Sequence, residues 1–256
     1  MPLYEKSVRL LFHDLLQELG LQKGEILDKQ RIYSWFNQKY PLVKQGTISA
    51  HTTLFSTNSP SRIHHTIDPN GKDDLFYQID GKRFRLYDSK SDPNPIYVGS
   101  KVAIQDEDSE IITDPSDENV IGDNEFAYEK DLQNFLAKNL NLIEPGLTLY
   151  REEGISGIEF PVGNRAIDIL ALDKNKNYVV IELKVSRGYD RVVGQILRYM
   201  AWIRKYQAEI NQKVRGIIIA REITEDLILA CSETRNVELF EYSLSVSLKK
   251  IENPEM

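Results

Sequence analysis

Three charged residues, Asp168, Glu182 and Lys184, interrupt two stretches that otherwise have the pattern of buried β-strands. Alternating apolar residues predict strands over residues 166–172 and 178–184, and the polar turn 173–177 between them makes the two strands antiparallel neighbours. Glu182 and Lys184 share one face of the second strand. An unpaired, ionised carboxylate inside such a sheet would be costly, so we expect Asp168 and Glu182 to share a divalent cation.

The elements that must position these residues form a pattern of mixed helices and strands. An apolar stripe predicts a helix over residues 126–140, and a second helix over 190–205 begins at Asp190. The run VRGIIIA predicts a central buried strand, followed by a helix over 224–234 and strands near 237–242 and 246–250. This order predicts an α/β (α+β) fold in which helices flank a mixed sheet.

Composition excludes several classes of protein. The chain has 256 residues, of which 41% are hydrophobic, and this is enough for a packed core. It has neither an apolar run of membrane-spanning length nor an amino-terminal leader pattern, so we expect a cytoplasmic protein with no membrane partner. The single cysteine, Cys231, falls in an apolar helical pattern and predicts a buried thiol.

The net charge of −7 is concentrated in the middle of the chain. Residues 1–88 carry 12 basic and 10 acidic side chains, residues 89–125 carry 2 and 10, and residues 126–256 carry 18 and 19. The acidic middle contains several prolines and few large apolar residues. We therefore expect two domains, 1–88 and 126–256, joined by the linker 89–125, which is either a solvated spacer or a DNA-mimicking autoinhibitor.

The first domain has the pattern of a winged helix-turn-helix module. Apolar spacing predicts helices over 4–19 and 28–38 and a third helix after Gly46, and Asp80-Gly81 predicts a hairpin between strands 75–79 and 83–87. The third helix would then be the recognition helix. An alternative is a winged helix that serves protein contacts or dimerisation. The candidate DNA-binding residues are Lys44, Gln45, Thr47, Ser49, His51, Thr52, Asn58 and Arg62.

Three histidines, His51, His64 and His65, raise the alternative of a metal site in the first domain. His64 and His65 are adjacent, so in an extended segment their imidazoles would point in opposite directions. No nearby pattern of cysteines or carboxylates completes a zinc site. We therefore expect these histidines to contact phosphate or solvent.

The second domain resembles the PD-(D/E)xK nuclease superfamily. The resemblance rests on Asp168, followed after thirteen residues by Glu182-Leu183-Lys184. More narrowly, the segments EKDLQNFL, IEPGL, AIDILALD, VVIELK and GQILRYMAWI resemble the catalytic domain of NucS/EndoMS-type endonucleases over roughly residues 126–242. The amino-terminal half of that family is a β-rich DNA-binding and dimerising domain, and here this chain departs from it.

The resemblance implies hydrolysis of phosphodiester bonds. Asp168, Glu182 and the Leu183 carbonyl would bind Mg²⁺, or Mn²⁺, and Lys184 would serve the attacking water. Gln195 and Tyr199 share one helical face and would orient these groups, and Glu129 would add a carboxylate from the first helix. The alternatives are a structural ion pair among Asp168, Glu182 and Lys184, and an exposed helical Glu129.

These patterns predict an Mg²⁺-dependent endonuclease for double-stranded DNA, with no organic cofactor, that is targeted by a winged helix. A restriction or genome-defence enzyme of the type II kind fits this architecture. The alternatives are a mismatch- or structure-specific repair endonuclease of the NucS/EndoMS type and a non-catalytic DNA-binding regulator. Cutting both strands would need two active sites, so we expect a homodimer.

Overall fold

The computed structural model describes residues 4–97, 123–184 and 190–243. In its amino-terminal part, Ser7 caps the first helix by accepting a hydrogen bond from the Leu10 amide, and Gly20 ends that helix in the left-handed conformation. Three helices followed by a hairpin were predicted, and this order is confirmed, with one additional short strand. The elements are α1 (Val8–Leu19), β1 (Leu27–Asp28), α2 (Lys29–Lys39), α3 (Gln45–Phe55), the 3-10 turn η1 (Pro60–His64), β2 (Phe76–Gln78) and β3 (Arg83–Leu86). The three strands form an antiparallel sheet in the order β1-β3-β2.

The carboxy-terminal part is built on a six-stranded mixed sheet. Its path is β11-β10-β9-β8-β4, with β7 also paired to β8, and the predicted strands β8 and β9 are antiparallel neighbours. The elements are α4 (Asp123–Lys138), the 3-10 turn η2 (Leu140–Leu142), β4 (Thr148–Leu149), β5 (Arg151–Glu152), β6 (Ile155–Ser156), β7 (Ile158–Val162), β8 (Arg165–Leu172), β9 (Tyr178–Lys184), α5 (Asp190–Tyr206), β10 (Val214–Ala220), α6 (Glu225–Ser232) and β11 (Val237–Glu241).

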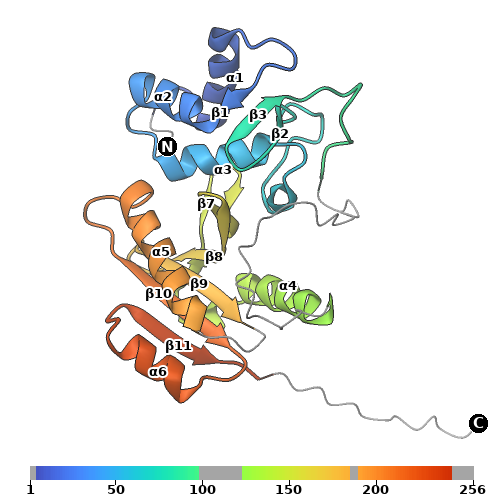
Figure 1. Ribbon diagram of the computed structural model, residues 1–256. Helices are drawn as coiled ribbons and strands as arrows, with labels where there is room; N and C mark the ends of the chain where they lie inside the picture. The colour runs from blue at the N-terminus through green and yellow to red at the C-terminus, as the bar shows by residue number, and fades with distance from the viewer. Residues whose placement is uncertain (1–3, 98–122, 185–189, 244–256) are drawn as a thin grey trace, which may run out of the picture.

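Two helices cover opposite faces of this sheet, as Figure 1 shows for α4 and α5. Ile196 of α5 packs in the same apolar cluster as Val180 of β9, whereas Leu136 of α4 packs with the alternate residues Val179 and Ile181. The predicted mixed sheet flanked by helices is therefore confirmed. The expected strand over residues 246–250 lies outside the described residues.

The two parts of the chain pack directly against each other. In Figure 1 helix α3 lies at their junction, next to β7 and α5, and its contacts with these two elements and β6 confirm the placement. One apolar cluster runs through both parts, since it contains residues of α1 and α3 together with residues of β7 and α5. Polar contacts add to it. The Val8 amide donates to Glu153 (2.7 Å), and the Thr66 amide donates to the Gly154 carbonyl (2.8 Å). The Gln207 side chain donates to the Thr47 hydroxyl (3.4 Å) and, within its own part of the chain, to the Tyr150 hydroxyl (2.9 Å).

The expectation that α3 presents a polar face to DNA is wrong for most of its residues. Thr47, Ser49, His51 and Thr52 are all buried, with at most 6% of each side chain exposed. The helix is made mainly of small residues, so neighbouring elements can approach it from both sides. An added Cβ at Gly46 would lie only 2.1 Å from the Gln207 Oε1 atom of the other part. A helix enclosed in this way cannot enter a DNA groove.

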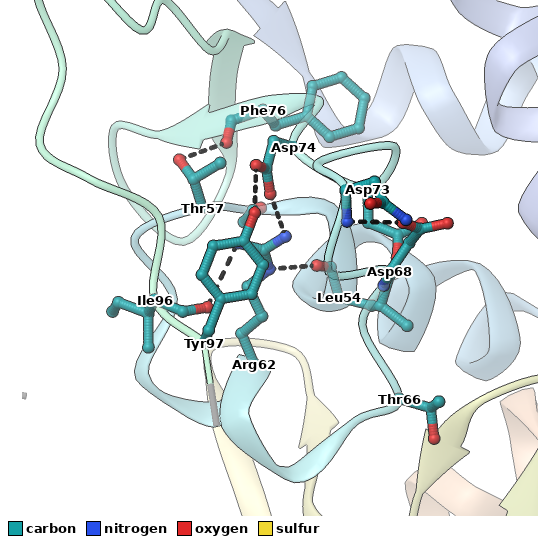
Figure 2. Close-up of polar contacts among 12 residues, drawn as sticks. Leu54, Thr57, Arg62, Thr66, Asp68, Asp73, Asp74, Phe76, Ile96 and Tyr97 are labelled. Atoms are coloured by element: carbon teal, nitrogen blue, oxygen red, sulfur yellow. Dashed lines mark hydrogen bonds and ion pairs between the residues drawn. The ribbon is translucent and has the colours of Figure 1, made fainter. Parts of the chain in front are cut away.

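Arg62 was also expected to contact DNA, but the structure buries it completely. Figure 2 shows its guanidinium paired with Asp74 and donating to the carbonyl oxygens of Leu54 (2.8 Å) and Ile96 (3.3 Å). Its guanidinium carbon also lies 5.2 Å from the centre of the Tyr97 ring. Arg62 therefore fastens residues 96–97 to the amino-terminal part and is not available to a phosphate.

The other residues that were predicted to contact DNA lie at or just beyond the ends of helix α3. Lys44 is partly exposed and forms an ion pair with Glu209 (3.0 Å), which joins the two parts of the chain. Asn58 exchanges hydrogen bonds with the backbone of Gln78 in β2. Gln45, at the start of α3, is also partly exposed. DNA contact by these three residues stays a prediction.

The first residues of the expected linker pack on the amino-terminal part. Asp92 pairs with Arg85, and the Ile96 amide donates to the Thr57 carbonyl (2.8 Å). Residues 123–125 of the expected linker begin helix α4, and residues 98–122, which carry most of the acidic side chains behind the proposed autoinhibitory role, lie outside the described residues. Across the described ranges, no helix is long and apolar enough to span a membrane. Cys231 is a buried free thiol, as expected.

Candidate active site

The site forms where strands β8 and β9 stop pairing. The last paired residues are Ile169 and Ile181, and the same register would place Asp168 opposite Glu182. Asp168 instead uses its carboxylate, because Oδ2 accepts the backbone N–H of Leu183 at 2.7 Å. This side-chain bond replaces a rung of the ladder and holds the Asp168 carboxylate beside β9.

Glu182 is almost completely buried, with 1% of the residue exposed. Its Oε1 accepts hydrogen bonds from Lys184 Nζ (3.1 Å) and from the Gln195 side chain, which also donates to the Tyr199 hydroxyl (3.2 Å). Its Oε2 is buried and has no hydrogen-bond partner within the part of the chain that the structure describes. A buried carboxylate oxygen left in this way is costly, and a cation would compensate it.

Electrostatics at the site favour a bound cation. Burial raises the pKa of Asp168 well above its usual range, and the neighbouring Glu182 charge raises it further against the opposing effect of Lys184. Burial likewise raises the pKa of Glu182, again opposed by Lys184. For Lys184, burial lowers the pKa, but the two carboxylates outweigh it and the net shift is upward. Lys184 therefore stays charged at neutral pH.

Helix α4 brings two further side chains to the site. Glu129 is half-buried, and burial raises its pKa while Lys184 opposes that shift. Gln133 is 3% exposed, and its Nε2 donates both to Glu159 Oε1 (2.9 Å) and to the Asp168 carbonyl (3.0 Å). The structure thus brings together the predicted Asp168, Glu182, Lys184, Gln195, Tyr199 and Glu129, and it adds Gln133 and Glu159.

Glu159 was not among the predicted site residues. It lies in β7, which pairs with β8 through Ile158–Ile169 and Phe160–Ile167, so the register places Glu159 opposite Asp168. Pro161 follows two residues later, and proline argues against a strand in a sequence pattern. The alternation of Ile158, Phe160 and Val162 was the signal that could have revealed this strand.

The residues present fit a divalent cation of the magnesium type. Mg²⁺ commonly uses one or two protein carboxylates and fills its other positions with water and substrate phosphate. Asp168 and Glu182 provide such a pair, and the unpartnered Glu182 Oε2 needs a positive charge. No group of three His, Cys, Asp or Glu side chains within the described ranges could by itself enclose a metal. A ligand role for the Leu183 carbonyl stays a prediction.

The histidines of the first part do not form a metal site in the described residues. His51 Nδ1 lies 2.9 Å from the Thr47 carbonyl, and His65 Nδ1 accepts the Ser156 amide at 3.2 Å. Both rings are buried at the junction of the two parts. The expectation that His51 and His65 face solvent or phosphate is therefore wrong, because these rings join structural elements.

In a comparison with known proteins, the two parts of the chain match different family models. Residues 128–249 match the model of the Endonuclease NucS C-terminal domain, and residues 7–86 match a Domain of unknown function (DUF7669). The carboxy-terminal part is therefore similar to the C-terminal domain of NucS endonucleases.

Among curated relatives, Endonuclease NucS of Pyrococcus abyssi is 32% identical over 98 residues, which cover 38% of this chain and 35% of the relative. Endonuclease NucS of Bifidobacterium adolescentis is 28% identical over 177 residues, or 69% of each chain. The chain thus spans only about a third of the length of the archaeal relatives of this kind.

Two solved structures resemble part of the chain. A repair endonuclease from Pyrococcus abyssi has 27% sequence identity and a TM-score of 0.38, covering 44% of this chain and 46% of its own. An EndoMS–dsDNA complex has 26% identity and a TM-score of 0.39, covering 46% of each chain.

Proposed function

We propose that this protein is a divalent-cation-dependent DNA endonuclease that cleaves mismatched or otherwise irregular duplexes. The observation that carries this proposal is the convergence of Asp168, Glu182 and Lys184 around an unpartnered, buried carboxylate oxygen, inside a domain that matches the NucS model. In a purely structural ion pair, a buried carboxylate oxygen is expected to have a hydrogen-bond partner. The unpartnered Oε2 of Glu182 therefore favours a cation site over a structural cluster.

The side chains divide the chemistry of phosphodiester hydrolysis among them. A bound divalent cation would supply Lewis acidity at the phosphate and lower the pKa of a water. Asp168 and Glu182 would hold it, and the Leu183 amide fixes the Asp168 carboxylate in place. Lys184 stays protonated beside Glu182, where it can offset the charge that develops on the phosphate. Gln195 fixes the Glu182 carboxylate and is itself held near Tyr199.

The packing of the amino-terminal part favours structure-directed over sequence-directed cleavage. A restriction enzyme with winged-helix targeting would read bases through α3, but the side chains of this helix are enclosed between the two parts of the chain. We propose that this winged-helix-like unit braces the nuclease domain. The match to the model of the NucS C-terminal domain also supports the repair alternative.

Cleavage assays with site variants test this function. With Mg²⁺, the wild-type protein should cut DNA that carries mismatches, and chelation with EDTA should stop it. Asp168→Asn and Lys184→Ala should each abolish cleavage, whereas Lys174→Gln, at an exposed lysine of the β8–β9 turn, should not change it. Cleavage that survives in both site variants would overturn the assignment. DNA binding without cleavage of any substrate would favour the non-catalytic regulator.

Double-strand cleavage by one active site per chain requires two chains, and we propose a homodimer on DNA. Sedimentation of the protein with and without a mismatched duplex tests this. A complex of two chains per duplex is the expected result, and a complex of one chain that still cuts both strands would contradict it.

A further inference from the structure

Glu159 has a strained backbone within strand β7. Its φ is +51°, a left-handed conformation that non-glycine residues rarely adopt. Regular pairing with β8 nevertheless continues on both sides, at Ile158 and at Phe160. The distortion is thus confined to the position opposite Asp168. Strain held at one point by regular structure around it often marks a functional residue.

The strained residue lies where β7 changes the apolar cluster that it contacts, and β8 makes the same change between Ile167 and Ile169. In a regular strand, residues two apart lie on the same face. Ile158, however, packs against the apolar cluster on the α4 side, whereas Phe160 belongs to the cluster that includes α5. The strand register places Glu159, Asp168 and Glu182 at consecutive positions in one row across β7, β8 and β9.

Gln133 holds Glu159 in this row. Its buried side chain donates to Glu159 Oε1 and to the Asp168 carbonyl, so one amide ties the two acidic residues together. The Glu159 charge acts on the site, since it contributes to raising the pKa of Asp168, Glu182 and Glu129. Keeping a third negative charge here would oppose folding unless a positive charge balanced it.

We propose that Glu159 is a further carboxylate of the cation site, which stabilises the divalent cation from outside the Asp168–Glu182 pair. This inference rests on the proposed function. The unpartnered Oε2 of Glu182 marks the place of the cation. Since no three acidic or histidine side chains among the described residues could enclose a metal directly, Glu159 acts through its charge and through solvent. Outer partners of this kind typically change metal affinity by about 10- to 100-fold.

Calorimetric titration of Mn²⁺ into the DNA-free, full-length protein tests the inference without relying on activity. In Glu159→Gln, the side-chain carbonyl can still accept the Gln133 hydrogen bond, but the charge is gone. We expect its Mn²⁺ affinity to fall about 10-fold or more. In cleavage assays the same variant should need correspondingly more Mg²⁺ for half-maximal rate.

A second variant separates the cation effect from folding. Glu159→Gly suits the positive φ, so its melting temperature should equal or exceed that of the wild type while its Mn²⁺ affinity falls. The matched control is Lys176→Gly, which relieves a φ of +64° in the distant β8–β9 turn. This control should leave Mn²⁺ affinity unchanged.

The outcomes distinguish this inference from the proposed function. If Asp168→Asn loses Mn²⁺ binding while both Glu159 variants bind as tightly as the wild type, the inference is overturned and the proposed function stands. If Asp168→Asn binds Mn²⁺ like the wild type, the cation site itself is misplaced and the proposed function fails. Weakened binding in both folded Glu159 variants supports the inference.

Discussion

Lys184 is held 3.1 Å from Glu182 and faces three carboxylates, so its charge is set by the site and not by solvent. Lys184→Gln keeps much of the side-chain length but removes the charge. We expect the single-turnover cleavage rate to fall about 100- to 1,000-fold, as for the loss of other groups that stabilise a transition state. DNA affinity, measured by fluorescence anisotropy with Ca²⁺, should change little. A rate within a few-fold of wild type would contradict this role.

Replacing two of the glycines with alanine should change the free energy of unfolding in opposite directions. An added Cβ at Gly157 would lie 2.1 Å from the Leu170 carbonyl oxygen, which is backbone and cannot move aside cheaply. Gly157→Ala should therefore destabilise the protein by about 2 kcal/mol or more. Gly194, in helix α5, has open space around it, and Gly194→Ala should stabilise by about 0.5–1 kcal/mol. Urea denaturation measures both, and equal effects would contradict the packing described.

Some site residues were predictable from the sequence, whereas Gln133 and Glu159 were not predicted. Asp168 and Glu182 stand out because each is a charge on an apolar strand, and Lys184 follows from strand alternation. Glu159 could not be found in this way, since its role depends on a positive φ and on a register between strands. Neither of these is encoded in the type of one residue.

At the scale of elements, His51 in α3 and His65 just after η1 make the free energy of unfolding depend on pH. Burial lowers the pKa of His51 to about 4 and that of His65 to about 3. Arg9 lowers the pKa of His51 as well, while Asp73 and the contacts with Thr47 and Glu153 oppose the shift. In the unfolded chain both histidines have pKa values near 6.5. Between the folded-state pKa values and about pH 6.5, the unfolded state therefore binds more protons than the folded state.

The free energy of unfolding should consequently fall as the pH decreases from about 6.5 toward 4, by about 1.4 kcal/mol per pH unit for each histidine. Urea denaturation at pH 7.5, 5.5 and 4.5 measures this. In His51→Phe the free energy of unfolding should fall less steeply as the pH decreases, because the imidazole that must stay neutral in the folded state is gone. Substituting the exposed His13 with Gln is the control and should leave the slope unchanged. Equal slopes in wild type and His51→Phe would contradict the prediction.

Element boundaries in the carboxy-terminal part followed closely from the sequence pattern, because β8 and β9 are apolar strands with buried residues on both faces, and α5 has an apolar stripe. The role of α3 did not follow. Its hydroxyl and imidazole side chains have the composition of a DNA-reading surface. Their burial depends on the other half of the chain, and the contacts between distant segments cannot be deduced from local pattern.

At the scale of the whole molecule, the shared apolar cluster predicts that both parts unfold together. Two independent domains on a flexible tether would give two calorimetric transitions. We expect one cooperative transition, with equal midpoints by near-ultraviolet and far-ultraviolet circular dichroism. Two separated transitions would contradict the packing at α3 and would return support to the tethered arrangement expected from the charge distribution.

We propose that the Asp168–Glu182–Lys184 site cleaves irregular duplex DNA. The most direct measurement compares single-turnover cleavage, in Mg²⁺, of two duplexes that differ by one base, so that one is fully paired and the other holds a single mismatch. We predict rapid cleavage near the mismatch by the wild-type protein, slow cleavage of the paired duplex, and neither with Asp168→Asn. Equal cleavage of both duplexes, at a site fixed by sequence, would contradict this account.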